Sequence, residues 1–198
     1  MAARGGAFRI VGGRLGGRRF GRRPPPGTRP TSERVREALA SALQARGWIQ
    51  GAVVLELYAG TGALSFECLS RGARHAVLLE ANRRLVEQTR RDAEALGLSE
   101  RLSAAAMRLP ASPERLGERL GPLLPSPATL LLADPPYAQA DQVTTVLQAL
   151  DEAELLAPRL ALVVEHDRRH PPSLPPLVQR RELCHGETVM TLGLLERP

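Results

Sequence analysis

The segment Asp134-Pro135-Pro136-Tyr137 has residue types and a spacing that suggest chemistry on an amino group. Neither proline has an N–H, and both have a fixed backbone, so their carbonyls remain available as acceptors. The Asp134 carboxylate and the Pro135 carbonyl can both accept hydrogen bonds from one planar NH₂ group, and the Tyr137 ring can stack on a base. The segment therefore predicts a clamp that orients an amine for attack on an electrophile, although it also fits a proline-fixed turn that ends a strand.

A glycine-rich turn, Tyr58-Ala59-Gly60-Thr61-Gly62, lies earlier in the chain. Glycines let the backbone approach a ligand closely and turn sharply into a helix. The turn lacks the third glycine of the dinucleotide fingerprint, because Ser65 stands at that position, and it lacks the Gly-Lys-Ser/Thr of a phosphate loop. On its own the pattern is equally typical of a tight turn that binds nothing.

Two carboxylates flank this turn and indicate which ligand it would hold. Glu80 ends the next apolar run, where an acid can accept hydrogen bonds from both hydroxyls of an adenosine ribose. Glu56 stands just before the glycines, where it suits a cationic group and sits poorly against a pyrophosphate. S-adenosylmethionine carries an ammonium and a sulfonium and has no phosphate, so we predict it as the cofactor.

The elements that must position these residues alternate between short apolar runs and helical patterns. The runs predict strands at 53–57, 76–80, 102–106, 129–133 and 160–164, and a final hairpin that turns at His185-Gly186. The helical patterns predict helices from Thr31, which could cap the first one, and then at about 63–71, 83–96, 112–120 and 141–150. Such alternation predicts an α/β fold with a parallel sheet covered on both faces, and with ligands at the carboxyl ends of the strands.

The positive charge is concentrated near the beginning of the chain. Residues 1–36 contain ten arginines and one acid, whereas the whole chain of 198 residues has a net charge of only +6 and contains no lysine. A genomic bias in composition could explain arginine in place of lysine, but it does not explain the clustering. We expect residues 1–30 to form a basic arm or hairpin that contacts nucleic acid, and residues 31–198 to form the enzyme domain. The candidate contacts are Arg14, Arg18, Arg19, Arg22 and Arg23.

Composition excludes several other classes of protein. No apolar run reaches the ~18 residues of a membrane span. Cys68 and Cys184 are the only cysteines, which fits a reducing cytoplasm. The histidines and cysteines show no metal-ligand spacing, so we expect no metal, and His166 is expected at an exposed strand end. Trp48 is expected to be a core or staple residue rather than a platform for a base.

Taken together, these residues resemble a known family, the bacterial 16S rRNA guanine-N2 methyltransferases (RsmD family). The resemblance runs nearly from end to end and rests on these segments: Arg9-Ile10-Val11-Gly12-Gly13, Gly27-Thr28-Arg29-Pro30-Thr31, Arg34-Val35-Arg36-Glu37-Ala38-Leu39, Tyr58-Ala59-Gly60-Thr61-Gly62-Ala63-Leu64, Ser70-Arg71-Gly72-Ala73, Glu80 and Asp134-Pro135-Pro136-Tyr137. The Asp-Pro-Pro-Tyr signature also occurs in other amino-group methyltransferases. The arm and the Arg-Pro-Thr segment are more specific.

The resemblance implies a Rossmann-like class I methyltransferase fold, in which the sheet has seven mostly parallel strands and the last is antiparallel. It also implies methyl transfer from S-adenosylmethionine to N2 of guanine 966 of 16S rRNA in the small ribosomal subunit or its assembly intermediate, by a monomer. The implied cofactor residues are Glu56, Tyr58 to Gly62, Glu80, Arg29 and Thr31, and the implied amine-binding residues are Asp134 to Tyr137. One departure is Ala104-Ala105-Ala106, where related enzymes often carry an Asp or Asn for the adenine amine.

Two other functions remain open from the residues alone. An amino-group methyltransferase that acts on DNA or protein would use the same donor site and clamp. A non-catalytic rRNA-binding assembly factor would keep the fold and the basic arm without turnover.

Overall fold

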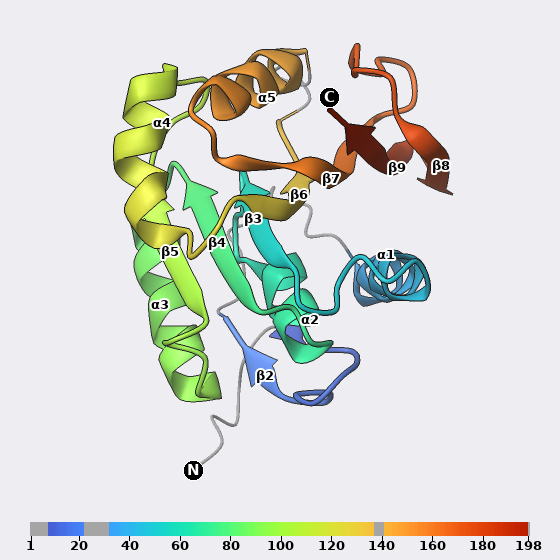
Figure 1. Cartoon of the computed structure of the whole chain (residues 1–198). Coiled ribbons are helices and arrows are strands. Elements are labelled where there is room, and N and C mark those ends of the chain that lie inside the picture. The colour runs from blue at the N-terminus through green and yellow to red at the C-terminus, as the bar shows by residue number, and fades with distance from the viewer. Residues whose placement is uncertain (1–7, 22–31, 137–140, 198) are drawn as a thin grey trace.

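A seven-stranded sheet forms the centre of the protein in the computed structural model, which describes residues 8–21, 32–136 and 141–197 (Figure 1). In spatial order its strands are β5 (Leu102–Ala106), β4 (His75–Glu80), β3 (Val53–Leu57), β6 (Ala128–Ala133), β7 (Leu156–Asp167), β9 (Thr188–Glu196) and β8 (Val178–His185). Neighbouring strands from β5 to β7 are parallel, whereas β9 pairs antiparallel with both β7 and β8.

The strand order reverses between β3 and β6. The chain passes from β3 outward to β4 and β5, and then crosses back to place β6 on the other side of β3. In open α/β sheets, ligands bind at the carboxyl ends of the strands next to such a reversal. The topology therefore directs attention to the ends of β3, β4 and β6.

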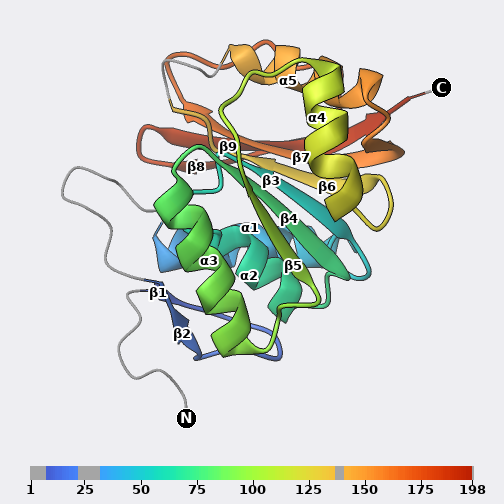
Figure 2. The same cartoon turned by 90° about the vertical axis from the view of Figure 1, so that its left-hand side faces the viewer.

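Helices cover both faces of the sheet, as the apolar runs predict. In Figure 2, α1 (Glu33–Ala45), α2 (Ala63–Ser70) and α3 (Arg83–Leu96) lie below the sheet, and α4 (Pro113–Leu120) and α5 (Gln142–Glu152) lie above it. A short 3₁₀ turn, Gly121–Leu123, follows α4. Successive residues of β3 point alternately into two hydrophobic cores. Val54 belongs to the core between the sheet and α1 to α3, and Leu55 belongs to the core between the sheet and α4 and α5.

The N-terminal residues that the structure describes form a hairpin of β1 (Phe8–Arg9) and β2 (Arg19–Phe20), which lies beside α2 in Figure 1. Its apolar residues belong to the core under α1 to α3, where the ring of Phe20 lies 4.6 Å from that of Phe66 between centroids. Burial of Phe8, Ile10 and Phe20 therefore joins the hairpin to the sheet domain.

Polar contacts fix the hairpin on α2. The buried Glu67 carboxylate accepts a hydrogen bond of 2.5 Å from the N–H of Val11. The hydroxyl of Ser70 accepts one of 2.9 Å from the N–H of Leu15. Gly13 lies so close to α2 that a Cβ there would be 2.2 Å from the Ser70 carbonyl oxygen, so only glycine fits.

The first helix is capped one residue later than expected. Ser32, not Thr31, accepts the capping hydrogen bond from the N–H of Val35, at 3.3 Å. Thr31 lies outside the described residues. The helix expected at 83–96 has those bounds, because Asn82 caps its beginning and Gly97, with a φ of 70°, ends it.

The expectation that His166 lies at an exposed strand end is wrong. Strand β7 continues to Asp167, and β9 pairs along its whole length, so His166 is buried. Its Nε2 lies 2.9 Å from the hydroxyl of Thr191 on β9 and its Nδ1 lies 2.9 Å from the Asp167 carbonyl. The ring therefore has hydrogen-bond partners on both nitrogens, which accounts for a polar side chain in this position.

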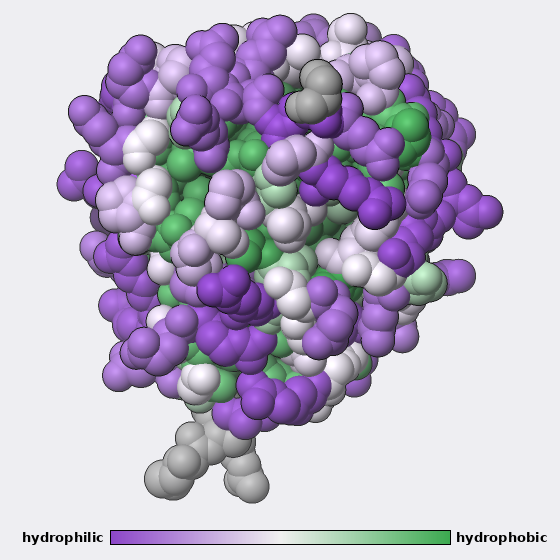
Figure 3. Space-filling model, viewed as in Figure 1, coloured by the Kyte–Doolittle hydropathy of each residue, from purple (hydrophilic) through white to green (hydrophobic). Residues whose placement is uncertain are grey.

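None of the helices in the described ranges is long and apolar enough to cross a membrane. Hydrophilic side chains cover most of the face in Figure 3, and hydrophobic ones are visible mainly in the gaps between them.

Candidate functional site

Three carboxylates gather at the carboxyl edge of β3, β4 and β6. Glu56 pairs across the sheet with Leu78 on β4 and Leu132 on β6. Glu80 is the last residue of β4, and Asp134 directly follows β6. The negative charges of Asp134 and Glu80 both raise the pKa of Glu56, so the three groups are close enough to interact electrostatically.

Glu56 is held in a buried position by the first turn of α2. Its Oε2 accepts a hydrogen bond of 3.0 Å from the N–H of Ser65 and a short one from the Ser65 hydroxyl. Burial raises the pKa of Glu56 to about 7; the Ser65 hydrogen bonds oppose this rise, and the charges of Asp134 and Glu80 add to it. A cationic ligand at this edge would favour the ionised carboxylate.

Ser65 is a residue that the sequence analysis used only to exclude a dinucleotide fingerprint. In the structure it is fully buried and orients the Glu56 carboxylate. The signal was its place in the glycine motif, since a small hydroxyl side chain fits where a third glycine would allow close packing of helix on strand.

Glu80 connects the glycine turn to the end of β4. Its Oε2 accepts a hydrogen bond of 2.8 Å from the N–H of Gly60, and its Oε1 accepts one of 2.7 Å from the N–H of Asn82. Each carboxylate oxygen has a second lone pair, so both oxygens can still accept from a ligand.

The turn between β3 and α2 faces open space. Gly60 has a φ of 54°, and a Cβ built on it would meet no protein atom within 4 Å. Gly62, with a φ of 71°, is different, because its Cβ would lie 2.5 Å from Cδ2 of Leu78. Packing therefore requires a glycine at position 62, whereas the absence of a side chain at Gly60 leaves open space beside the turn that a ligand can fill. Tyr58 also has a positive φ, of 56°, which is strained for an aromatic residue.

Asp134 is exposed at the end of β6, although protein atoms still surround part of its carboxyl. This desolvation raises the pKa of Asp134 to about 6. Pro135 beside it is buried and Pro136 is exposed. The edge therefore carries two carboxyls, Glu56 and Asp134, that both titrate closer to neutral pH than an ordinary acid.

The structure describes only some of the other predicted site residues. Arg14, Arg18 and Arg19 are exposed on the hairpin. Five more lie outside the described residues: Arg22, Arg23, Arg29, Thr31 and Tyr137.

The last three residues of β5, Ala104 to Ala106, offer no polar side chain to an adenine. Ala104 and Ala105 are buried, and the N–H of Met107 donates to the Glu80 carbonyl at 3.1 Å. In the described parts of the chain, no group of three or more His, Cys, Asp or Glu residues is placed to hold a metal ion.

Comparisons with known proteins match most of the chain. A family model described as conserved hypothetical protein 95 matches residues 8–193. The "Putative rRNA methyltransferase YlbH" of Bacillus subtilis is 27% identical over 187 residues, which are 91% of this chain and 95% of that protein. The "Ribosomal RNA small subunit methyltransferase D" of Escherichia coli strain K12 is 40% identical over 87 residues, which are 42% of this chain and 41% of that protein.

Solved structures match over nearly the full length. The "Putative methyltransferase yhhF" from Escherichia coli superimposes with a TM-score of 0.76 at 28% identity, covering 96% of this chain and 99% of that one. An RNA methyltransferase from Salinibacter ruber in complex with S-adenosyl-L-homocysteine has a TM-score of 0.60 at 17% identity, covering 86% of this chain and 95% of that one, which is a likeness of fold alone.

Proposed function

The chain belongs to the RsmD family, whose model is described as conserved hypothetical protein 95, and from this premise we propose that it methylates a guanine in ribosomal RNA. Its fold is that of the class I methyltransferases. The reaction is transfer to the exocyclic N2 amine of guanine 966 in 16S rRNA, with the small ribosomal subunit or its assembly intermediate as substrate. The chain acts as a monomer in the cytoplasm.

The observation that carries the proposal is the meeting of Glu56, Glu80 and Asp134 at one sheet edge. S-adenosylmethionine supplies an activated methyl group on a positively charged sulfonium. The site fits this cofactor because the carboxylates concentrate negative charge there, and because the open side of Gly60 leaves room for it. Glu80 would accept hydrogen bonds from the ribose hydroxyls, and Glu56 would face the cationic methionine end.

Further cofactor contacts are assigned by the family resemblance. The backbone of the turn from Tyr58 through Ala59, Gly60 and Thr61 to Gly62 would lie along the cofactor. Arg29 and Thr31 would lie near its methionine end.

The Asp134 carboxylate and the Pro135 carbonyl would hold the guanine amine. Two acceptors on one planar NH₂ group fix the direction of the nitrogen lone pair, and such positioning lowers the barrier of an in-line displacement. Tyr137 would stack on the base, and Pro136 would keep the backbone rigid. Asp134 need not be a strong base, because the amine proton becomes acidic only as the new N–C bond forms. Its negative charge also stabilises the positive charge that develops on the nitrogen.

The hairpin arginines would bind the RNA backbone beside this site. The hairpin is docked on Glu67 and Ser70 of α2, whose other end is the glycine turn. An eight-residue helix is about 12 Å long, so Arg14, Arg18 and Arg19 lie within reach of RNA that flanks a guanine at the clamp. Arg22 and Arg23 would extend this surface.

The proposal is tested by identifying the methylated nucleotide. The protein is incubated with labelled S-adenosylmethionine and small subunits that lack the modification, and the digested rRNA is analysed by mass spectrometry. We expect one N2-methylguanine, at guanine 966. Label at another position would overturn the assignment of the nucleotide, and label in DNA or protein instead would overturn the substrate class. Cofactor binding without any transfer would indicate a non-catalytic assembly factor.

A further inference from the structure

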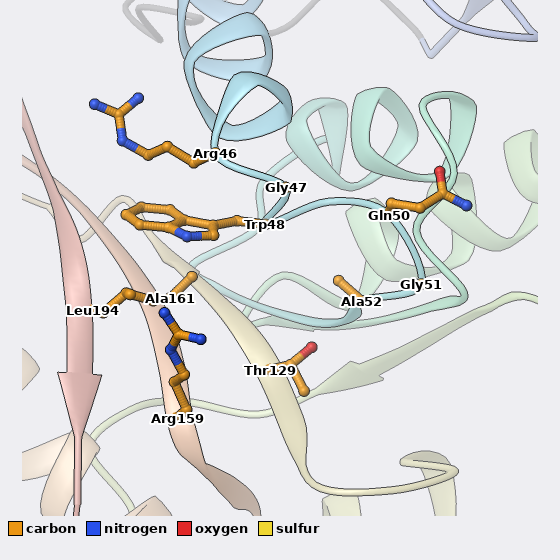
Figure 4. A pocket seen from close by; sticks show the side chains of 10 residues that line it. All are labelled: Arg46, Gly47, Trp48, Gln50, Gly51, Ala52, Thr129, Arg159, Ala161 and Leu194. Carbon is orange, nitrogen blue, oxygen red and sulfur yellow. The ribbon is translucent and has the colours of Figure 1, made fainter. Parts of the chain in front are cut away.

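A cavity lies beside the residue that precedes β3, opposite the edge of the sheet that carries Glu56, Glu80 and Asp134. It has a volume of about 350 Å³ and is lined by the α1–β3 loop and by the sheet, with Arg46, Trp48, Gln50, Thr129, Arg159 and Leu194 among its walls (Figure 4). This volume is within the range of small-molecule sites. Nothing in the proposed methyl transfer uses these residues.

The cavity is separated from the methyl-transfer edge by the length of the sheet. Ala52 in its wall directly precedes β3, and Glu56 lies near the other end of that strand. A five-residue strand spans roughly 17 Å. A ligand in this cavity therefore cannot be the cofactor or the target guanine, but flanking RNA can extend that far.

Trp48 combines a packed side with a side that faces the cavity. It is partly buried against the core under α1 to α3, and it also lines the cavity. The guanidinium carbon of Arg46 lies 5.5 Å from its ring centroid, and Arg159 extends from β7 towards the indole (Figure 4). An aromatic ring with a guanidinium group over one face and a second guanidinium group in the same cavity can bind a nucleotide, because the base can stack on the other face and the charges can attract the phosphate.

We propose that this cavity binds one unpaired nucleotide of the RNA substrate, with its base on Trp48 and its phosphate between Arg46 and Arg159. This inference rests on the proposed function, because it supplies a second contact for the same RNA. This proposal is contrary to the expectation from the sequence that Trp48 is a core or staple residue rather than a platform for a base. The apolar wall formed by Ala161 and Leu194 would lie against the base, and the Thr129 hydroxyl, whose oxygen accepts a hydrogen bond of 3.1 Å from the N–H of Val53, can donate to it.

Glu196 carries a negative charge that would compete with a phosphate for Arg159, and this competition can be tested. Its carboxylate lies 3.4 Å from Nε of Arg159, and both side chains are exposed. Exposed pairs of this kind are weak, so Arg159 can exchange the carboxylate for a phosphate. A Glu196→Gln substitution removes the competing negative charge and should strengthen RNA binding a few-fold.

The chain offers a direct reporter, because Trp48 is its single tryptophan. The full-length protein is titrated with single-stranded oligo-uridylate, and Trp48 fluorescence is recorded together with the anisotropy of a labelled oligonucleotide. We expect RNA binding to quench Trp48. The double variant Arg46→Gln/Arg159→Gln should bind about tenfold more weakly, and its salt slope should fall by about one for each arginine. The matched control, Arg115→Gln/Arg119→Gln on α4, should lose less affinity and keep the quenching.

Three results would overturn the inference. One is RNA binding that leaves Trp48 fluorescence unchanged. Another is an equal loss of affinity in the Arg46/Arg159 and the Arg115/Arg119 variants. The third is displacement of the oligonucleotide from Trp48 by inorganic phosphate at a concentration comparable to that of the oligonucleotide. The cavity would then be a simple anion site, and the proposed stacking would be wrong. None of these results depends on methyl transfer, so a failure of the proposed function would appear separately, as the absence of N2-methylguanine.

Discussion

The N–H of Gly60 donates a hydrogen bond of 2.8 Å to Oε2 of Glu80. This bond joins the turn after β3 to the last residue of β4, so one carboxylate both shapes the glycine turn and remains able to accept from a ligand. The consequence is that the shape of the turn and the recognition of the ligand can be separated by substitution.

Glu80→Gln tests this separation. The amide oxygen of glutamine can still accept the hydrogen bond from the N–H of Gly60, but the amide nitrogen then faces the N–H of Asn82 and can accept neither from it nor from a ribose hydroxyl. We expect the free energy of unfolding to fall by about 1 kcal/mol, from the lost bond to Asn82, and the affinity for S-adenosylmethionine to fall about 10- to 100-fold, since hydrogen bonds to a charged group contribute about 1.5–3 kcal/mol. Calorimetry measures the affinity, with Glu87→Gln on the exposed side of α3 as the control. An unchanged affinity would show that Glu80 only shapes the turn.

Glu56 should make cofactor binding depend on pH. Burial raises the pKa of Glu56 from 4.5 to about 7, so near neutral pH the empty site holds a proton that a cationic ligand would displace. Affinity should therefore rise between about pH 6 and pH 8. Titration of this one group can raise the association constant by at most about tenfold per pH unit. Calorimetry in buffers of different ionisation enthalpy measures the proton release, which should be reduced in Glu56→Gln.

The same shift sets the sign of the effect of Glu56 on stability. An acid with a raised pKa in the folded chain favours folding at pH below its unfolded value, near 4.5, and this advantage is lost as the pH rises through about 7. Glu56→Gln should consequently lose less stability than the parent protein between about pH 5 and pH 8. Parallel thermal-unfolding curves across this range would contradict the burial argument.

The two glycines of the turn should respond differently to alanine. Gly62→Ala places a Cβ 2.5 Å from Leu78 at a positive φ, so we expect a loss of about 2–4 kcal/mol in the free energy of unfolding. Gly60→Ala meets no protein atom and should lose only about 1 kcal/mol, from its positive φ. Its cofactor affinity should nevertheless fall, because the methyl group occupies the open space beside the turn. Chemical denaturation and calorimetry distinguish the two, and equal losses of stability would refute the contrast.

Glu67 should hold the hairpin in place. Glu67→Ala leaves the N–H of Val11 without its acceptor and removes a buried side chain, so we expect a loss of about 2–4 kcal/mol in the free energy of unfolding. Hydrogen exchange should show faster exchange at Val11 and Leu15, and RNA affinity should fall while cofactor affinity is kept. Glu94→Ala, on the exposed side of α3, is the control. Slow exchange at both amides in Glu67→Ala would mean that apolar packing alone docks the hairpin.

Local patterns in the sequence predicted the elements well. Strand β3 was recognisable because all five of its residues are apolar except Glu56, and α3 because its cap Asn82 and its terminating Gly97 are both local signals. The edge that brings Glu56 and Glu80 together followed from the alternation of strands and helices.

The features that were not predicted depend on contacts between distant residues. His166 is buried because β9 pairs with it from more than twenty residues away. Glu67 contacts the hairpin through a buried carboxylate, although local patterns would place a charged residue of a helix at the surface. The cavity beside Trp48 is formed by a loop and three strands, β6, β7 and β9, that come together only in the fold.

The most direct test of the central claim, that Asp134 holds the amine rather than the cofactor, is the single-turnover rate of methyl transfer by Asp134→Asn. The rate should fall about 10²- to 10³-fold, while cofactor affinity stays within a few-fold of the parent protein. Glu118→Gln on α4, the matched control, should keep the full rate. In the parent protein, the rate should decline as the pH falls below about 6, where the Asp134 carboxyl becomes protonated. A fully active Asp134→Asn variant would contradict the account, as would one whose only defect is lost cofactor binding.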